Sequence, residues 1–179
     1  EKARPVACGD VLRRIIGGTF CKDYGQAISE RFEPKGQHGV SVPGGTELMA
    51  TKATVAYQQE FGILTYDAAN AFNAMARRAI LPALAELIPP VVPYALQIYA
   101  REEPPKLLFK MDSGETAIIH SSTGVQQGCN LGPLCYSAGL LRLLTDFNAN
   151  PPVAGAQIMA YIDDLLVLLP PTHATSASA

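Results

Sequence analysis

The stretch IMAYIDDLLVLL, residues 158–169, places two adjacent aspartates, Asp163 and Asp164, in the middle of an apolar run. Ionised carboxylates in such a run are costly unless a cation neutralises them. Two buried strands joined by a turn would present both carboxylates at the edge of a sheet, where a hard divalent metal ion finds oxygen ligands. An ordinary hairpin turn is the alternative, because aspartate is a common turn former. The stretch therefore predicts a strand–turn–strand unit with a candidate metal site at its turn.

A third carboxylate, Asp67, ends another apolar run, FGILTY at residues 61–66. We expect a buried strand here. If this strand lies antiparallel to its neighbour, its end meets the Asp163–Asp164 turn, although the two segments are far apart in the chain. Carboxylates from separate strands that hold two metal ions are typical of phosphoryl-transfer enzymes. A helix N-cap is the alternative role for Asp67.

The composition favours a single globular domain. The 179 residues are 48% hydrophobic, which is enough for a packed core and excludes a disordered chain. The apolar runs are shorter than a membrane span, and we expect no leader peptide. The four cysteines have no C-x-x-C spacing, so we expect reduced thiols rather than a zinc site, in a nuclear or cytoplasmic protein that is not secreted.

Charge is distributed unevenly along the chain. The net charge is −2, which is unusual for a nucleic-acid-binding protein. Residues 1–52 contain eight Lys or Arg and six Asp or Glu, whereas the remainder contains six and ten. This division would let the first part meet phosphates while the second holds metal ions. Arg4 is one candidate phosphate contact, and a solvated surface position is the alternative.

Hydrophobic patterns and turn residues predict an α+β fold with an antiparallel sheet packed on helices. The expected helices cover residues 11–16, 46–59, 70–87, 92–101 and 134–147. The expected strands cover residues 61–67, 106–111, 116–120, 157–162 and 165–169. Asp10 and Thr46 are expected to cap the first two helices, a break is expected at Gly17-Gly18, and Pro82 is expected to kink or divide the third helix. Residues 33–45 are expected to form a loop, and residues 170–179 a disordered tail.

Two further segments carry candidate binding residues. Small residues and then Phe72 follow Asp67; small side chains let a ligand approach the backbone, and an aromatic ring can form a wall against it. A core phenylalanine is the alternative. Gln127 and Gly128 lie in a glycine-bracketed loop, residues 124–132, whose backbone N–H groups can bind an anion or a nucleotide. A plain loop before a helix is the alternative.

Taken together, these motifs resemble the palm of a reverse transcriptase, an RNA-directed DNA polymerase. Residues 161–164 resemble its Y-x-D-D signature, residues 67–73 its first catalytic motif, and residues 127–134 its Q-G-x-x-x-(G/S)-P-L motif, in the family's order. The segments RPV at 4–6 and GVSVPGG at 39–45 resemble those of non-LTR (LINE-type) retrotransposon enzymes. The likeness covers roughly residues 4–169. Ile162 and Cys129 depart from the residues that many relatives carry, and neither position supplies a catalytic carboxylate.

The resemblance implies a polymerase palm at residues 61–169 after a partial fingers region at residues 1–60, with the thumb absent from this chain. It implies that Asp67, Asp163 and Asp164 bind two Mg²⁺ ions, which Mn²⁺ can replace, to activate a primer 3′-hydroxyl and hold a triphosphate. Phe72 would be the steric gate against a ribose 2′-hydroxyl. The residues implied to line the nucleotide and template pocket, or to contact phosphate, are Gln127, Gly128 and Arg4.

The implied partners are an RNA template, a DNA primer and dNTPs, with no membrane. The expected activity is templated addition of dNTPs to a primer 3′-hydroxyl, a nucleotidyltransferase reaction. A catalytically decayed retroelement remnant and a non-catalytic nucleic-acid-binding module with a palm fold are the alternatives, together with a related intron maturase. The lysine that the family uses later as a proton donor has no counterpart after Arg142. The truncated chain is therefore expected to need its missing parts for activity.

Overall fold

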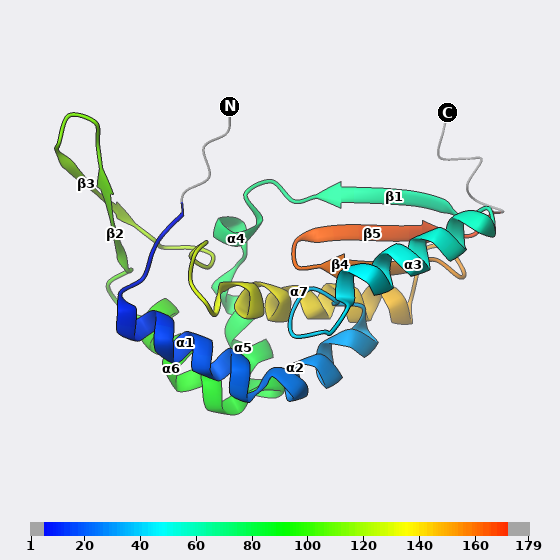
Figure 1. Ribbon diagram of the computed structural model, residues 1–179, viewed down its shortest axis with the longest axis horizontal. Coiled ribbons are helices and arrows are strands. Elements are labelled where there is room, and N and C mark those ends of the chain that lie inside the picture. Colours follow the sequence, from blue (N-terminus) through cyan, green and yellow to red (C-terminus); the bar gives the residue numbers. More distant parts are fainter. Residues whose placement is uncertain (1–5, 172–179) are drawn as a thin grey trace.

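A computed structural model describes residues 6–171 and confirms the α+β class (Figure 1). The α-helices are α1 (Val11–Asp23), α2 (Gly25–Phe32), α3 (Gly45–Gln58), α4 (Ala71–Ala74), α5 (Arg77–Leu87), α6 (Val92–Tyr99) and α7 (Gly132–Ala149). Short 3₁₀ helices are η1 (Glu33–Lys35) and η2 (Pro89–Val91). The strands are β1 (Gly62–Asp67), β2 (Lys106–Lys110), β3 (Thr116–His120), β4 (Gln157–Tyr161) and β5 (Asp164–Leu169).

The central sheet has the strand order β1-β5-β4, and both strand pairs are antiparallel. The register pairs Gly62 with Leu169 at one end and Asp67 with Asp164 at the other. Strand β5 therefore lies in the middle, and its start is the end of the sheet at which β1 finishes (Figure 1). The antiparallel sheet predicted from the sequence is confirmed. The predicted hairpin of β2 and β3 also forms, and it projects from the body as a separate two-stranded sheet.

Side chains of the sheet alternate between two apolar clusters. Ile158, Ala160 and Val167 belong to the main core, which also contains the buried face of α7 and residues of α5 and α6. Met159 and Leu168 point to the opposite face and pack with Ala56 of α3. This alternation is the period of two that a strand imposes. Asp67 and Asp164 follow the same alternation, so they lie on the face opposite α7.

Helix α2 was not predicted from the sequence, and the other helices differ from the predictions in three further respects. Helix α1 is capped by Asp10 as expected, but it runs unbroken through Gly17, where a side chain would meet Asn130 and Leu131. The chain breaks between α4 and α5 rather than at Pro82, which lies inside a continuous α5. The N-cap of α3 is Gly44 rather than Thr46.

The reasons for these corrections are tertiary contacts. Gly17 does not break the helix; it lets α1 lie close to the segment that contains Asn130 and Leu131. The apolar face of α5 buries Ile80, Leu84 and Leu87, which offsets the hydrogen bond that Pro82 cannot donate. In the part of the chain that the structure describes, no helix has the length and apolar character of a membrane span. Most of the expected tail, residues 172–179, lies outside the described residues.

Candidate functional site

The core of the candidate site is a pair of carboxylates at one end of the sheet. Asp67 is the last residue of β1, and Asp164 is the first residue of β5; they are direct partners across the two strands. Directly opposite residues of an antiparallel pair project from the same face of the sheet. Both side chains are exposed on the face that α7 does not cover. The expected meeting of Asp67 with the end of the strand–turn–strand unit is therefore found.

Asp163 lies in the two-residue turn that joins β4 to β5. Tyr161 and Asp164 are paired, so Ile162 and Asp163 are the central residues of this turn. Burial raises the pKa of the nearby Tyr136 hydroxyl, and the negative charge of Asp163 raises it further. The Asp163 carboxylate is therefore close enough to Tyr136, near the start of α7, to affect its ionisation.

These carboxylates fit a hard divalent cation that shares its coordination sphere with a substrate. Among residues 6–171 the structure gathers no group of three or more His, Cys, Asp or Glu side chains able to hold a metal ion. Mg²⁺ is commonly bound by one or two carboxylates together with substrate phosphates and water, and not by an all-protein cage. The facing pair of Asp67 and Asp164 meets that requirement, with Asp163 as the neighbouring third acid.

Phe72 lies in α4, directly after the end of β1. Its ring stacks on Tyr136 of α7, with ring centroids 5.1 Å apart and an interplanar angle of 17°. A side chain at Gly132 would meet the Phe72 ring at 3.6 Å, so the start of α7 also borders it. The ring is half-buried. Phe72 is thus held in one orientation close to the segment that carries Asp67.

The loop before α7 is fixed by Arg77, the first residue of α5. Its guanidinium donates to the carbonyl oxygens of Gly124 (2.8 Å), Ser121 (2.6 Å), Thr123 (3.2 Å) and Tyr99 (3.3 Å). Burial lowers the pKa of this guanidinium. Because an arginine stays charged in proteins, these carbonyls are held by charge-assisted bonds.

Gln127 and Gly128 contact the beginning of the chain. The backbone N–H of Ala7 donates to the Gln127 carbonyl at 2.7 Å. Gly128 has a φ of 105°, and a side chain there would meet the Ala7 carbonyl oxygen at 2.7 Å. The structure thus brings the segment that follows the RPV motif onto the glutamine–glycine motif. Arg4 itself lies outside the described residues.

Three residues with roles in this site were not singled out from the sequence. They are Gln37, Arg77 and Tyr136. Gln37 is fully buried beside the Ile162 turn, although residues 33–45 are predicted to be a plain loop. The available signal is the pair of glycines around Gln37 and His38, since glycine marks a close approach of two backbones. Arg77 and Tyr136 carry no such local signal.

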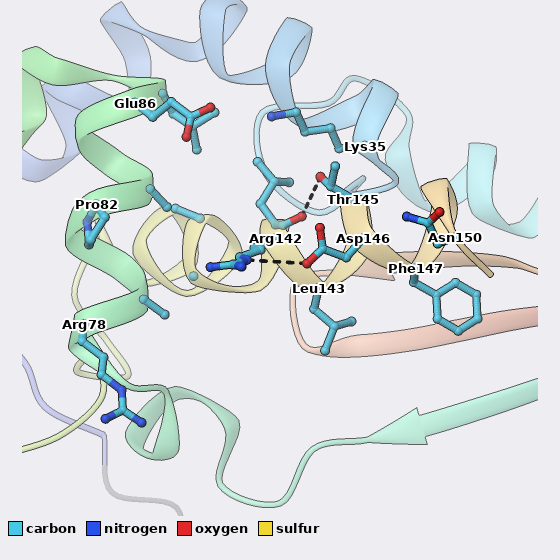
Figure 2. A pocket seen from close by; sticks show the side chains of 16 residues that line it. Lys35, Arg78, Pro82, Glu86, Arg142, Leu143, Thr145, Asp146, Phe147 and Asn150 are labelled. Atoms are coloured by element: carbon cyan, nitrogen blue, oxygen red, sulfur yellow. Dashed lines mark hydrogen bonds and ion pairs between the residues drawn. The ribbon is translucent and has the colours of Figure 1, made fainter. Parts of the chain in front are cut away.

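A groove of about 1080 Å³ lies elsewhere, between α5 and α7 (Figure 2). Arg78 and Pro82 line one side; Arg142 and Asp146, which form an ion pair of 3.5 Å, line the other. None of the three candidate aspartates lines it. This groove is therefore separate from the candidate site.

Comparison with known sequences identifies the family. Residues 4–176 match the family described as "Reverse transcriptase (RNA-dependent DNA polymerase)". The chain belongs to the reverse transcriptase family. The resemblance found in the sequence motifs is confirmed at this level. The chain is also 30% identical over 187 aligned residues to the "Retrotransposable element SLACS 132 kDa protein" of Trypanosoma brucei gambiense, a match with which the expected non-LTR type is consistent.

This reverse transcriptase chain is only part of the length of its relatives. The alignment covers 99% of the chain but 15% of the retrotransposable-element protein. Two solved structures share the fold, both of telomerase from Candida tropicalis and both 10% identical in sequence. The apo form covers 88% of the chain, and the chain covers 35% of it, with a TM-score of 0.64. The form in complex with a telomeric RNA fragment covers 93% of the chain, and the chain covers 30% of it, with a TM-score of 0.63.

Proposed function

We propose that this chain is the fingers and palm portion of an RNA-directed DNA polymerase, which adds dNTPs to a primer 3′-hydroxyl along an RNA template. The observation that carries the proposal is the pairing of Asp67 with Asp164 at an exposed end of the sheet, within a chain of the reverse transcriptase family. An exposed sheet end bearing acids suits a reaction between two polyanions, provided that cations neutralise the charge. Fingers at residues 1–60 and palm at residues 61–169 are part of the proposal.

Each residue of the site has a proposed role. Asp67, Asp163 and Asp164 hold divalent cations, Mg²⁺ or Mn²⁺. When bound, these ions lower the pKa of the attacking hydroxyl and neutralise the triphosphate. Gln127 and Gly128 line the nucleotide and template pocket, where the loop fixed by Arg77 offers backbone N–H groups. Arg4 contacts phosphate in the fingers.

The experiment is primer extension on an RNA template by the chain joined to its natural downstream sequence. The wild type is expected to extend a DNA primer with dNTPs in Mg²⁺, and the Asp163→Asn/Asp164→Asn variant is expected to give no product, because asparagine keeps the shape of the turn but removes both charges. An inactive wild type would instead indicate the decayed remnant. Salt-sensitive nucleic-acid binding that is indifferent to Asp67→Ala, without extension, would indicate the binding module.

Phe72 is proposed to exclude ribonucleotides, and its substitution gives a second prediction. The ring is stacked on Tyr136 and cannot readily move aside, so an added 2′-hydroxyl would collide with it. For Phe72→Ala we expect the preference for dNTP over rNTP to fall roughly 10- to 100-fold. The measurement is the ratio of kcat/KM values for the two nucleotides on one primer–template. Phe20→Ala is the control, because that ring lies on α1; an unchanged ratio in Phe72→Ala would contradict the gate.

A further inference from the structure

Gln37 binds both backbone groups of one turn residue. Its side-chain Oε1 accepts from the Ile162 N–H at 2.9 Å, and its Nε2 donates to the Ile162 carbonyl at 3.2 Å. Oε1 also accepts from the Gly39 N–H at 3.0 Å. Gln37 is completely buried, although it lies 125 positions from Ile162 in the chain. A buried amide with three hydrogen bonds is a fixed structural element, because leaving its partners unpaired is costly.

Ile162 needs such a partner because its backbone is strained. Its φ is 58°, a value that is a genuine outlier for a β-branched residue. Two-residue hairpin turns with a positive φ at the first central position normally place glycine, asparagine or aspartate there. Here the first central residue is isoleucine, so the local sequence does not favour the turn that joins β4 to β5. The two hydrogen bonds from Gln37 stabilise the positive φ of Ile162, which the sequence of the turn does not favour.

The segment around Gln37 is built against this turn. Ala160 of β4 donates from its N–H to the Gly36 carbonyl, and the His38 N–H donates to the Ala160 carbonyl, both at 2.7 Å. These bonds attach residues 36–38 to the free edge of β4 in a parallel bridge. A side chain at Gly39 would collide with the backbone nitrogen and Cγ1 of Ile162. The close fit excludes any side chain at position 39 and leaves the Gln37 amide aimed at Ile162.

We infer that Gln37 is a positioning residue for the candidate catalytic acids. By holding Ile162 at a positive φ, Gln37 fixes the direction in which the next two residues, Asp163 and Asp164, present their carboxylates. Gln37 itself touches neither acid and acts through the backbone of the turn. The inference rests on the proposed function, since it assigns a purpose to a geometry that matters only if these acids bind a metal ion.

Asn148 of α7 provides a control, because its side chain also binds both backbone groups of one residue. Its Nδ2 donates to the Ile158 carbonyl at 3.0 Å, and its Oδ1 accepts from the Ile158 N–H at 2.9 Å. The same two-bond contact thus holds β4 near its other end, away from the turn. Gln37→Met and Asn148→Leu both replace an amide with an apolar side chain of similar size. Each variant removes a two-bond contact with the β4 backbone or its turn, but Gln37 is fully buried and Asn148 is exposed. The overall stability of both variants is therefore measured by urea unfolding, and only Gln37→Met is expected to release the turn.

The first measurement is amide hydrogen exchange of the 179-residue chain, which requires no catalysis. We expect Gln37→Met to raise the exchange rate of the Ile162 amide and its neighbours in the turn by about tenfold or more, because local opening becomes easier. Asn148→Leu is expected to raise exchange at Ile158 and not at the turn. If the amides of the turn exchange at the same rate in both variants, Gln37 does not hold the turn, and the inference is overturned.

The second measurement is the affinity for Mn²⁺ alone, titrated and followed by its electron paramagnetic resonance signal. Substitution of a residue that orients metal ligands typically lowers the metal affinity by roughly 10- to 100-fold. We expect a loss of Mn²⁺ affinity of that size for Gln37→Met. Asn148→Leu is expected to stay close to the wild type. If the wild type and Asp67→Asn bind Mn²⁺ equally, the proposed function and the inference both fail. If Asp67→Asn weakens Mn²⁺ binding but Gln37→Met binds Mn²⁺ as tightly as Asn148→Leu does, the inference alone fails.

A double substitution tests the cause directly. Glycine adopts a positive φ without strain, so Ile162→Gly removes the need for an outside partner. In that background Gln37→Met is expected to lose only a small part of the Mn²⁺ affinity that it loses beside Ile162. The difference between the two losses is the coupling between the residues. Equal losses in both backgrounds would show that Gln37 does not act through the φ of residue 162 and would overturn the inference.

Discussion

Asp67→Asn is expected to lower the rate of single-nucleotide addition by the parent polypeptide roughly 10³-fold, which is about 4 kcal/mol of transition-state stabilisation. Asp67 faces Asp164 across β1 and β5, so asparagine would leave one charge where two are needed to hold a cation. The shape of the site is preserved because the two side chains are nearly isosteric. The measurement is kcat for one dNTP on an RNA template, with circular dichroism to verify the fold.

Asp146→Asn is the control for this prediction. Asp146 is an exposed aspartate of α7 that pairs with Arg142 at the wall of the groove in Figure 2. Exposed pairs of this kind contribute little to stability. We therefore expect Asp146→Asn to extend primers like the wild type. A rate within tenfold of the wild type in Asp67→Asn would contradict the assignment of Asp67 as a catalytic acid.

Gly124→Ala is expected to destabilise the chain by about 3 kcal/mol or more, through overpacking added to backbone strain. Gly124 has a φ of 64°, and a side chain there would collide with the carbonyl oxygens of Phe72 and Asn73. The adjacent Val125 N–H donates to that same Phe72 carbonyl at 2.7 Å. A displaced loop would therefore move the aromatic residue proposed as the gate. The measurement is the midpoint of urea unfolding.

Gly114→Ala separates the two causes of this destabilisation. Gly114 also has a positive φ, 87°, but a side chain there would meet nothing within 4 Å. It should therefore show the conformational penalty alone, about 1–2 kcal/mol. Similar losses of stability in the two variants would show that the contact of Gly124 with the Phe72 segment is unimportant.

The strands and the acids at their ends were predictable from local pattern. Short apolar runs flanked by turn residues predicted every strand to within about two residues, which is the usual precision of element boundaries. The pairing of Asp67 with Asp164 then followed from antiparallel order, because each acid ends its own strand at the same edge. Phe72 was predictable as an aromatic residue close to Asp67, but its stacking on Tyr136 depends on where α7 starts.

The parts that were not predictable depend on contacts between distant segments. Gly17 resembles a helix break in the sequence, yet it marks the place where α1 approaches Asn130 and Leu131. Pro82 resembles a helix end, yet the burial of Leu84 holds α5 together. Gln37 is an ordinary polar residue until residues 36–38 are placed on β4. In each case the three-dimensional environment outweighs the local preference.

The parallel bridge between residues 36–38 and β4 has a practical consequence for protein expression. Without that segment, β4 would be an edge strand with unpaired backbone groups and apolar side chains such as Ile158 and Met159. Exposed edges of this kind recruit strands from other molecules. A shortened chain that starts at β1 would therefore be prone to aggregate, and soluble preparations should begin upstream of Gly36.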